Sequence, residues 1–399
     1  MCHYPWWCTQ FLSLLPYLCH VVKNDKYQVV IGLEVHAQLL TQSKLFCGDS
    51  ANFGASPNSH ISPVTLAHPG TLPKMNKKAI EYAIKLGLAL NCEIEMENYF
   101  ARKNYFYPDL PKGYQISQHT TPICKNGVVK IRLDNVERSI RLNRIHIEED
   151  AGKSLHDVDE NNTCIDLNRA GVPLLEIVSE PDLHSSDEAF AYVTELRRLV
   201  RWLNICDGNM EEGSMRCDAN ISIRLKGETK LGTRVEVKNL NSIRNVKRAI
   251  DLEVNRLIDI VEAGEKIIQE TRSYDADHNT TFSLRSKEDA DDYRYFADPD
   301  LTPFIITDAY LQEIKEALPA LPEALEKKYK EVFHLPEYDA HVICHDKAQV
   351  TYFEDTIRHT NNYKAAVNWL MGPVKSHLNE TNTDISEFKV APQKIAQLI

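Results

Sequence analysis

The chain has 399 residues, of which 43% are hydrophobic and 26% charged, a composition typical of globular proteins long enough to form two or three domains. Its formal net charge of −11 argues against a protein that binds nucleic acid through an overall positive potential. The 10 cysteines include no C-x-x-C pair. The sequence therefore indicates neither a zinc site nor a disulfide framework, and it favours reduced thiols in a cytosolic compartment.

The first 26 residues are apolar and aromatic and are interrupted by Pro5 and Pro16. They lack the basic start and the small-residue cleavage site of a secretory signal, and they are too short and too interrupted to span a membrane. We interpret residues 1–26 as an extension outside the fold, from an upstream start site or specific to the species, and we expect no membrane association.

The fold is expected to begin with a β-strand at residues 29–39, VVIGLEVHAQL. Residues alternate across a strand, so Glu34, His36 and Gln38 share one face and the apolar residues share the other. A carboxylate and an imidazole two positions apart can converge on one ion or one bound group. The alternative is a solvated strand face with unrelated polar side chains.

A loop-rich stretch at 43–73 and a helix at 76–90 follow, the helix indicated by apolar residues at helical spacing. The segment 101–118, ARKNYFYPDLPKGYQISQ, is dense in aromatic, basic, proline and glycine residues. It is either an aromatic-anchored surface loop or a substrate-facing loop that stacks bases or holds phosphate.

Further along, short apolar or alternating runs predict strands, and amphipathic runs predict helices. A polar and aromatic connector is expected at 270–304, and only helices after about residue 311. The strands are predicted at 128–133, 139–148, 172–178, 216–225 and 233–241, and the helices at 186–203 and 241–270.

Glu176 lies inside an apolar strand run, where a carboxylate is costly unless it is paired or metal-bound. Burial beside an arginine is the structural alternative. No glycine-rich phosphate loop accompanies it: the tail Gly152-Lys153-Ser154 is not a Walker A motif, because Ile147 stands where the first glycine belongs.

Several carboxylates and one imidazole lie on or just beyond separate strands. This donor set, without cysteine, suits Mg²⁺ or Mn²⁺ better than structural zinc, and Mg²⁺ beside phosphate oxygens is typical of phosphoryl transfer. The candidate ligands are Glu34, His36, Glu149, Glu176 and Glu236.

Seven motifs in order resemble the kinase-like B subunit of the heterotrimeric aspartyl/glutamyl-tRNA amidotransferase. They are IGLEVHAQL, RKNYFYPDLPKGYQISQ, HIEEDAGKS, DLNRAGVPLLEIVSEPD, EEGSMRCDANIS, EVKNLNS and DDYRYFADPD. The similarity runs from about Tyr27 to the end of the chain and includes NWLMG at 368–372.

The resemblance implies an α+β fold, with a mainly antiparallel-sheet cradle domain at 27–303, an all-α helical domain at 304–390 and the start of a tail domain at 391–399. It implies ATP-dependent phosphorylation of the side-chain carboxylate of mischarged Glu-tRNA(Gln) or Asp-tRNA(Asn). Ammonia that the amidase (A) subunit releases from glutamine then displaces the phosphate, and a small C subunit joins the other two. Carried over residue by residue, the Mg²⁺-binding set is the same five residues.

Further expectations depend on this resemblance. The location is cytoplasmic in bacteria, or organellar. The tRNA is expected to contact the 101–118 segment through Arg102, Lys103, Tyr105, Tyr107 and Lys112. Many members of the family carry paired cysteines after the first strand, whereas here Cys47 is accompanied by Asp49, Ser62 and Thr65, so we predict no zinc.

Two other functions fit the residues. One is an ATP-dependent carboxylate–amine ligase acting on a free small acid, although such a substrate would not call for aromatic residues among basic ones. The other is a tRNA-docking scaffold whose acids are structural, which the apolar surroundings of Glu176 disfavour. The sequence does not distinguish Glu-tRNA from Asp-tRNA as substrate.

Overall fold

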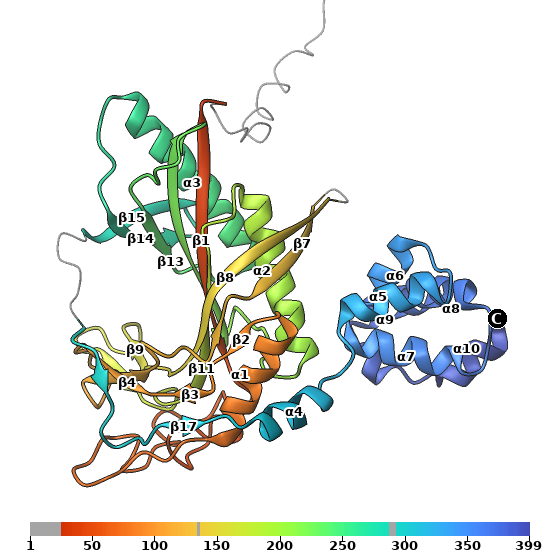
Figure 1. The fold of residues 1–399 in the computed structure, drawn as a ribbon, viewed down its shortest axis with the longest axis horizontal. Helices are drawn as coiled ribbons and strands as arrows, with labels where there is room; N and C mark the ends of the chain where they lie inside the picture. Colours follow the sequence, from red (N-terminus) through yellow and green to blue (C-terminus); the bar gives the residue numbers. More distant parts are fainter. Residues whose placement is uncertain (1–24, 134–135, 287–292) are drawn as a thin grey trace, which may run out of the picture.

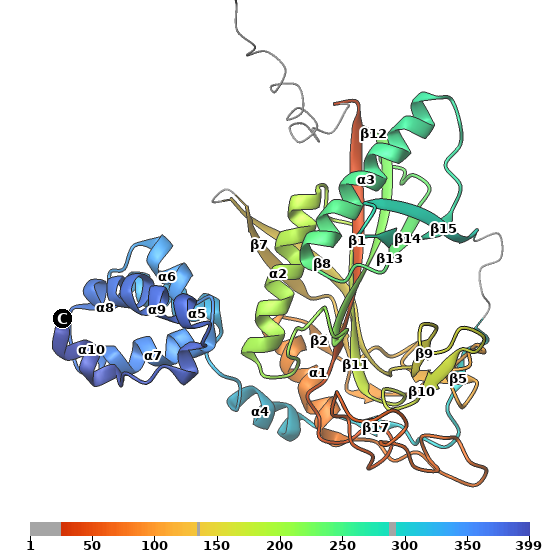
Figure 2. The same ribbon diagram turned by 180° about the vertical axis from the view of Figure 1, so that it is seen from behind.

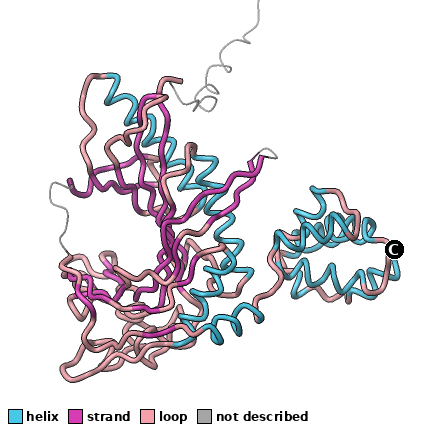
Figure 3. Tube along the Cα trace, viewed as in Figure 1, coloured by secondary structure: helices cyan, strands magenta, loops and turns pink. Residues whose placement is uncertain are grey.

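The computed structural model describes residues 25–133, 136–286 and 293–399. A large body built on one sheet is followed by a separate group of helices, and α4 lies between the two (Figure 1). Figure 3 shows the same division by secondary structure, with the strands confined to the large body. This confirms the α+β class and the order of its two parts.

The strands are β1 Tyr27–Gln38, β2 Glu93–Ile94, β3 Glu97–Asn98, β4 Ala101–Asn104, β5 Tyr114–Ser117, β6 Cys124–Lys125, β7 Val128–Leu133, β8 Val136–Glu149, β9 Lys153–Leu155, β10 Cys164–Asp166, β11 Pro173–Ser179, β12 Met215–Leu225, β13 Val235–Lys238, β14 Glu270–Asp275, β15 Thr280–Ser286, β16 Phe296–Ala297 and β17 Phe304–Ile305.

The helices are α1 Lys77–Ala89, α2 Ser186–Trp202, α3 Ile243–Glu262, α4 Asp308–Glu316, α5 Pro322–Glu331, α6 Glu337–Ile343, α7 Lys347–Ile357, α8 Tyr363–Trp369, α9 Lys375–Thr381 and α10 Pro392–Leu398. A π-helical turn lies at Leu370–Val374 and a 3₁₀ turn at Ile385–Glu387.

The main sheet has 10 strands in the order β15-β14-β13-β12-β1-β11-β8-β6-β2, with β7 paired to β8. Its pairs are antiparallel except for β13 and β14, which are parallel. The predicted first strand is therefore central, between β12 and β11, and its two faces are those of the whole sheet.

Helices α1, α2 and α3 cover one face of this sheet (Figures 1 and 2). The apolar residues of β1, among them Leu33, Val35 and Ala37, are buried in the core under these helices. Each helix begins at a polar cap: the side chains of Asn76, Ser185 and Ser242 accept hydrogen bonds from main-chain N–H groups of the first turn. The opposite face of the sheet is left for polar side chains.

The second core belongs to the helices after residue 321 and includes Trp202 from the end of α2. The Trp202 indole donates to the carbonyl of Ala320 at 3.0 Å, and the Lys347 ammonium donates to the carbonyl of Trp202 at 3.0 Å. In contrast, Ile306 and Ile314 still pack in the first core. The packing thus changes near residue 321, later than the predicted boundary at 303/304.

Two predicted loop regions contain strands. Residues 270–304, expected as a connector, supply β14, β15 and β16, and the 101–118 segment supplies β4 and β5, which pair with each other. These strands are short or lie near a sheet edge, so their apolar pattern is weak. At the end of the chain, α10 packs on α7 and buries Ile395 in the second core.

No helix in the described part of the chain is both long enough and apolar enough to cross a membrane.

Candidate active site

The open face of the sheet borders a pocket of about 710 Å³. Its floor comes from β1, β8, β11, β12 and β13, and one wall comes from the aromatic residues Tyr105, Tyr293 and Tyr295. Of the five predicted metal ligands, Glu34, His36, Glu176 and Glu236 line it. Strands far apart in the sequence therefore place these four side chains around one cavity.

Strand register explains this convergence. Directly opposite residues in an antiparallel pair lie on the same face. His36 of β1 lies opposite Glu176 on one side and Arg216 on the other, and Glu176 lies opposite His146 of β8. One row across four strands is thus Arg216–His36–Glu176–His146. The neighbouring row places Glu148 beside Leu174 and Gln38.

Two carboxylates and two imidazoles form a compact cluster in these rows. The Nε2 atom of His36 is 3.6 Å from Oε2 of Glu176 and 4.0 Å from Oε1 of Glu148. The Nε2 atom of His146 is 3.2 Å from Oε2 of Glu176 and 3.4 Å from Oε2 of Glu148. Possible ligand atoms of His36, Glu148 and Glu176 all lie within 4.8 Å of one another. This is the spacing that one small cation requires.

The cluster shifts the pKa values of its members. Burial would lower the pKa of both histidines, but the two carboxylates outweigh it, raising the pKa of His36 and taking that of His146 to about 9. Burial would raise the pKa of Glu176, yet His146 and His36 hold it well below its usual range. At neutral pH the cluster therefore contains an ionised Glu176 beside a protonated His146.

Glu34 and Glu236 lie one row further along the pocket. Glu34 accepts a hydrogen bond from the Asn220 amide at 2.8 Å, and its pKa is raised by burial and by the nearby Glu176 carboxylate. Glu236 accepts from the Thr271 hydroxyl at 2.8 Å and pairs with Lys238 at 2.8 Å. Both acids enlarge the acidic surface beside the His36 cluster.

The fifth predicted ligand, Glu149, does not join this group. It follows Glu148 on β8, so its side chain points to the other side of the strand. There its carboxylate accepts from the Lys112 ammonium at 2.5 Å and from the main-chain N–H of Ile116 at 2.9 Å. The geometry corrects the predicted ligand set: Glu148 occupies the place that was expected for Glu149.

The missed residues had a detectable signal. In RIHIEE the apolar Ile145 and Ile147 alternate with Arg144, His146 and Glu148, which places the latter three on the polar face of a strand. Strand periodicity alone would have selected Glu148 and added His146. Transfer of the family pattern selected the neighbouring acid instead.

The predicted tRNA-contact residues of the 101–118 segment have separate environments. Arg102 pairs with Asp298 and Asp300, at 2.9 and 2.8 Å, and Lys112 pairs with Glu149, so both cations are engaged within the fold. Tyr107, in contrast, is 59% exposed.

Lys103 and Tyr105 face the acidic pocket. The Lys103 ammonium lies 4.9 Å from the centre of the Tyr293 ring. Burial would lower its pKa, but Glu148, Tyr295 and Glu176 leave it raised, so Lys103 is a cation within the pocket. The Tyr105 hydroxyl donates to the side-chain carbonyl of Gln115 at 3.0 Å.

The residues at the family's cysteine positions also meet. The Cys47 thiol lies 3.3 Å from a carboxylate oxygen of Asp49 and 3.5 Å from the Thr65 hydroxyl, and the Thr65 hydroxyl donates to Asp49 at 2.5 Å. A hydroxyl and a thiol thus surround one carboxylate in this loop. The absence of zinc remains a prediction.

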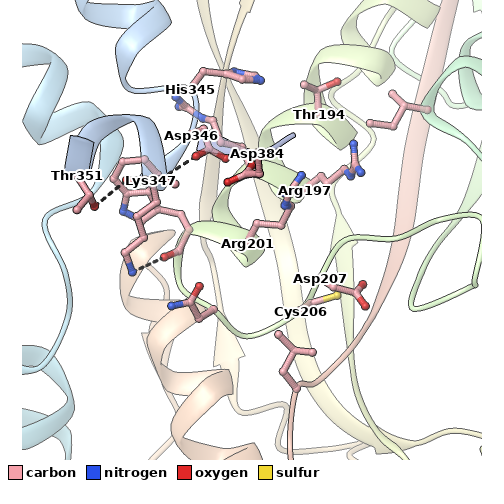
Figure 4. A pocket seen from close by; sticks show the side chains of 16 residues that line it. Thr194, Arg197, Arg201, Cys206, Asp207, His345, Asp346, Lys347, Thr351 and Asp384 are labelled. Atoms are coloured by element: carbon pink, nitrogen blue, oxygen red, sulfur yellow. Dashed lines mark hydrogen bonds between the residues drawn. The ribbon is translucent and has the colours of Figure 1, made fainter. Parts of the chain in front are cut away.

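A second hollow, of about 630 Å³, lies between α2 and the start of α7 (Figure 4). Arg197 and Arg201 of α2 face Lys347 and Asp384 across it. Its cations and acids are mixed, and the predicted metal ligands and tRNA contacts lie elsewhere. The acidic pocket on the sheet is therefore the better candidate for the active site.

Comparisons with known proteins agree with this choice. The GatB/GatE catalytic domain matches residues 29–312, and the GatB domain matches residues 351–399. Three similar relatives are each named as the B subunit of an aspartyl/glutamyl-tRNA(Asn/Gln) amidotransferase. Those of Thermodesulfovibrio yellowstonii, Chlorobaculum tepidum and Pelodictyon phaeoclathratiforme are 50%, 53% and 54% identical over 374, 373 and 374 residues, in each case 94% of this chain and 78% of the relative.

A sheet with an acidic pocket on its open face, followed by a helical region and matched by this catalytic domain, defines a carbon–nitrogen ligase of the amidotransferase class. The identity extends over nearly the whole chain. The chain belongs to the family of B subunits of the aspartyl/glutamyl-tRNA(Asn/Gln) amidotransferase.

Proposed function

We propose that this chain uses ATP to phosphorylate the side-chain carboxylate of glutamate on tRNA(Gln) or aspartate on tRNA(Asn), and that ammonia then converts the activated group to the amide. The observation that supports this most is the His36–Glu148–Glu176 cluster in the pocket of a chain that belongs to this family of amidotransferase B subunits.

The cluster fits a divalent cation such as Mg²⁺. Its possible donors are carboxylate oxygens and an imidazole nitrogen within 4.8 Å of one another, a hard donor set without cysteine. His146 supports the two carboxylates from the buried side, while Glu34 and Glu236 add negative charge along the same pocket. When bound with ATP, Mg²⁺ would screen the repulsion between the phosphates and the attacking carboxylate.

The reaction balances without a side-chain nucleophile. A carboxylate oxygen of the substrate attacks the terminal phosphorus of ATP, the bond to the bridging oxygen breaks, and ADP leaves. Ammonia then attacks the carbonyl carbon, phosphate departs with the carbon–oxygen bonding electrons, and a proton is lost to give the amide. The pocket cations, including Lys103, Arg216 and Lys238, are suited to hold anionic phosphates over the acids.

The partners are part of the proposal. The relatives are each named as one subunit of an amidotransferase acting with tRNA(Asn/Gln), which supports an assembly of three different subunits. In it the amidase (A) subunit supplies ammonia, and the small C subunit joins the other two. The exposed Tyr107 is a candidate tRNA contact on this chain. We place the reaction in the bacterial cytoplasm or in an organelle.

The test uses the chain assembled with its partner subunits. ADP formation and amidated tRNA are measured with ATP, Mg²⁺, ammonium and mischarged Glu-tRNA(Gln), with free glutamate as the comparison substrate. We expect amidation of the tRNA-bound residue and none of free glutamate. Glu176→Gln should lose activity. Glu180→Gln should keep it, because the Glu180 carboxylate accepts from the Asn143 amide at 2.8 Å and lies outside the pocket.

The outcomes separate the candidate functions. Equal turnover of free glutamate would favour the ligase acting on a small acid. Amidation that proceeds without ATP, or a fully active Glu176→Gln variant, would contradict the proposal that this pocket performs the activation step.

A further inference from the structure

We propose that the Arg216 guanidinium binds an anionic oxygen of the phosphoryl group during its transfer, which makes Arg216 a further catalytic residue of this site. The inference rests on the proposed function, because it assigns the phosphate-binding group within the same pocket. Three features of Arg216 support it: its position, a donor without an acceptor, and the contacts that hold its side chain.

Arg216 borders the His36 cluster. It belongs to β12 and lies directly opposite His36 of β1, at the end of the row that continues to Glu176. Side chains opposite each other in such a pair are neighbours, with Cβ atoms about 4.5–5.5 Å apart. Arg216 also lines the 710 Å³ pocket. A cationic side chain therefore lies beside the cluster at which a nucleotide-bound cation would sit.

The guanidinium has donors to spare. Its Nη2 atom donates to Oδ2 of Asp150 at 2.8 Å. Its Nε atom is buried, and within the described ranges it has no hydrogen-bond partner. An arginine carries five N–H donors in a planar fork, and a buried donor without an acceptor is costly. The side chain is still 36% exposed, so its fork can reach an oxyanion in the pocket.

Asp150 holds this fork in one orientation. Its carboxylate is 5% exposed and accepts from the Gln38 amide at 2.6 Å and from the main-chain N–H of Ala151 at 2.9 Å, as well as from Arg216. The Nε atom of Arg169 lies 3.7 Å from the same carboxylate. A donor whose direction is set before the substrate arrives stabilises developing charge without reorganisation.

The ligand is an oxyanion, and two groups in the reaction supply one: the phosphoryl group and the substrate carboxylate. The planar fork matches either. We assign the phosphoryl group because Arg216 is next to His36, within the cluster suited to the cation that accompanies ATP. The charge of a transferring phosphoryl group is the one that arginines commonly stabilise in such reactions.

The experiment compares Arg216→Gln and Arg216→Lys in the assembled enzyme, with ammonium, ATP and mischarged Glu-tRNA(Gln). The matched control is Arg141→Gln, because Arg141 pairs with Asp182 at 2.7 and 2.8 Å but lies outside the pocket. We expect kcat for ADP formation to fall about 100- to 1,000-fold in Arg216→Gln, as on loss of one preorganised donor. Arg216→Lys, which keeps the charge but lacks the fork, should fall in between, and Arg141→Gln should match wild type.

The outcomes decide the assignment. An Arg216→Gln enzyme that keeps more than half of the wild-type kcat overturns it, and so does a loss confined to KM for the aminoacyl-tRNA, which would indicate contact with the carboxylate. If Arg216→Gln does not fold, as judged by thermal melting, a wild-type kcat in Arg216→Lys overturns it equally. If wild type itself forms no ADP with mischarged tRNA, the proposed function fails and this assignment fails with it.

Discussion

Removal of His146 should destabilise the protein through the carboxylates that it supports. Glu148 and Glu176 are 3% and 8% exposed, and both lie within 3.4 Å of the His146 Nε2 atom. His146→Leu keeps the volume apolar but leaves these acids, among the described residues, with His36 and the Ser117 hydroxyl as close partners. The fold should remain, at reduced stability.

The size of the effect follows from burial. Removal of one partner from a buried ion pair costs about 3–5 kcal/mol, and the remaining partners favour the lower end, about 3 kcal/mol. For a body of this size each kcal/mol shifts the melting temperature by roughly 2–4 °C. His146→Leu should therefore melt about 6–12 °C below wild type at pH 7, measured by calorimetry without added metal.

The pH dependence has a definite sign. The folded-state pKa of His146, about 9, lies above its ordinary value of 6.5. Its stabilisation is thus fully present below about pH 6.5 and is lost as the pH rises through about 9. The difference between wild type and variant should shrink between about pH 7 and about pH 9.5.

His184 provides the control for this test. It is a second partly buried histidine, with Nδ1 2.8 Å from the carbonyl oxygen of Val29, and it lies outside the acidic pocket. His184→Leu should cost about 1 kcal/mol, the usual value of one hydrogen bond. If His146→Leu melts within about 2 °C of wild type, or if its deficit is the same at neutral and at alkaline pH, the charged support of the two acids is refuted.

Three further outcomes are expected. Glu148→Gln should weaken Mn²⁺ binding at least tenfold in a calorimetric titration, while Glu149→Gln should leave it near wild type, because adjacent strand residues face opposite sides; equal effects would contradict the placement of the cluster. Arg102→Gln should lower the melting temperature, since it removes the cationic partner of the fully buried Asp298 side chain; loss of tRNA affinity without loss of stability would restore its role as a tRNA contact. Gly87→Ala should cost about 1–3 kcal/mol in urea unfolding, because the new Cβ would lie 2.4 Å from the Cys124 sulfur; an unchanged midpoint would show that the thiol moves aside freely.

The sequence by itself determined the elements whose period is strong. The alternation of Glu34, His36 and Gln38 identified one polar strand face, and the structure has those side chains on the open side of the sheet. Helices α1 and α2 begin within a residue of their predicted starts, because a polar cap precedes an amphipathic run at each. These signals are local, so a single chain is enough to detect them.

Only the tertiary structure decided which side chains meet. Arg102 finds its partner Asp298 196 residues away, which turned a predicted tRNA contact into an internal ion pair. Strand register placed Arg216, His36 and His146 in one row, although nothing local to any of them indicates the others. It also separated Glu148 from Glu149. Pairing between distant strands sets the register, and a shift of one residue moves every side chain to the opposite face, so site membership is a property of the assembled sheet.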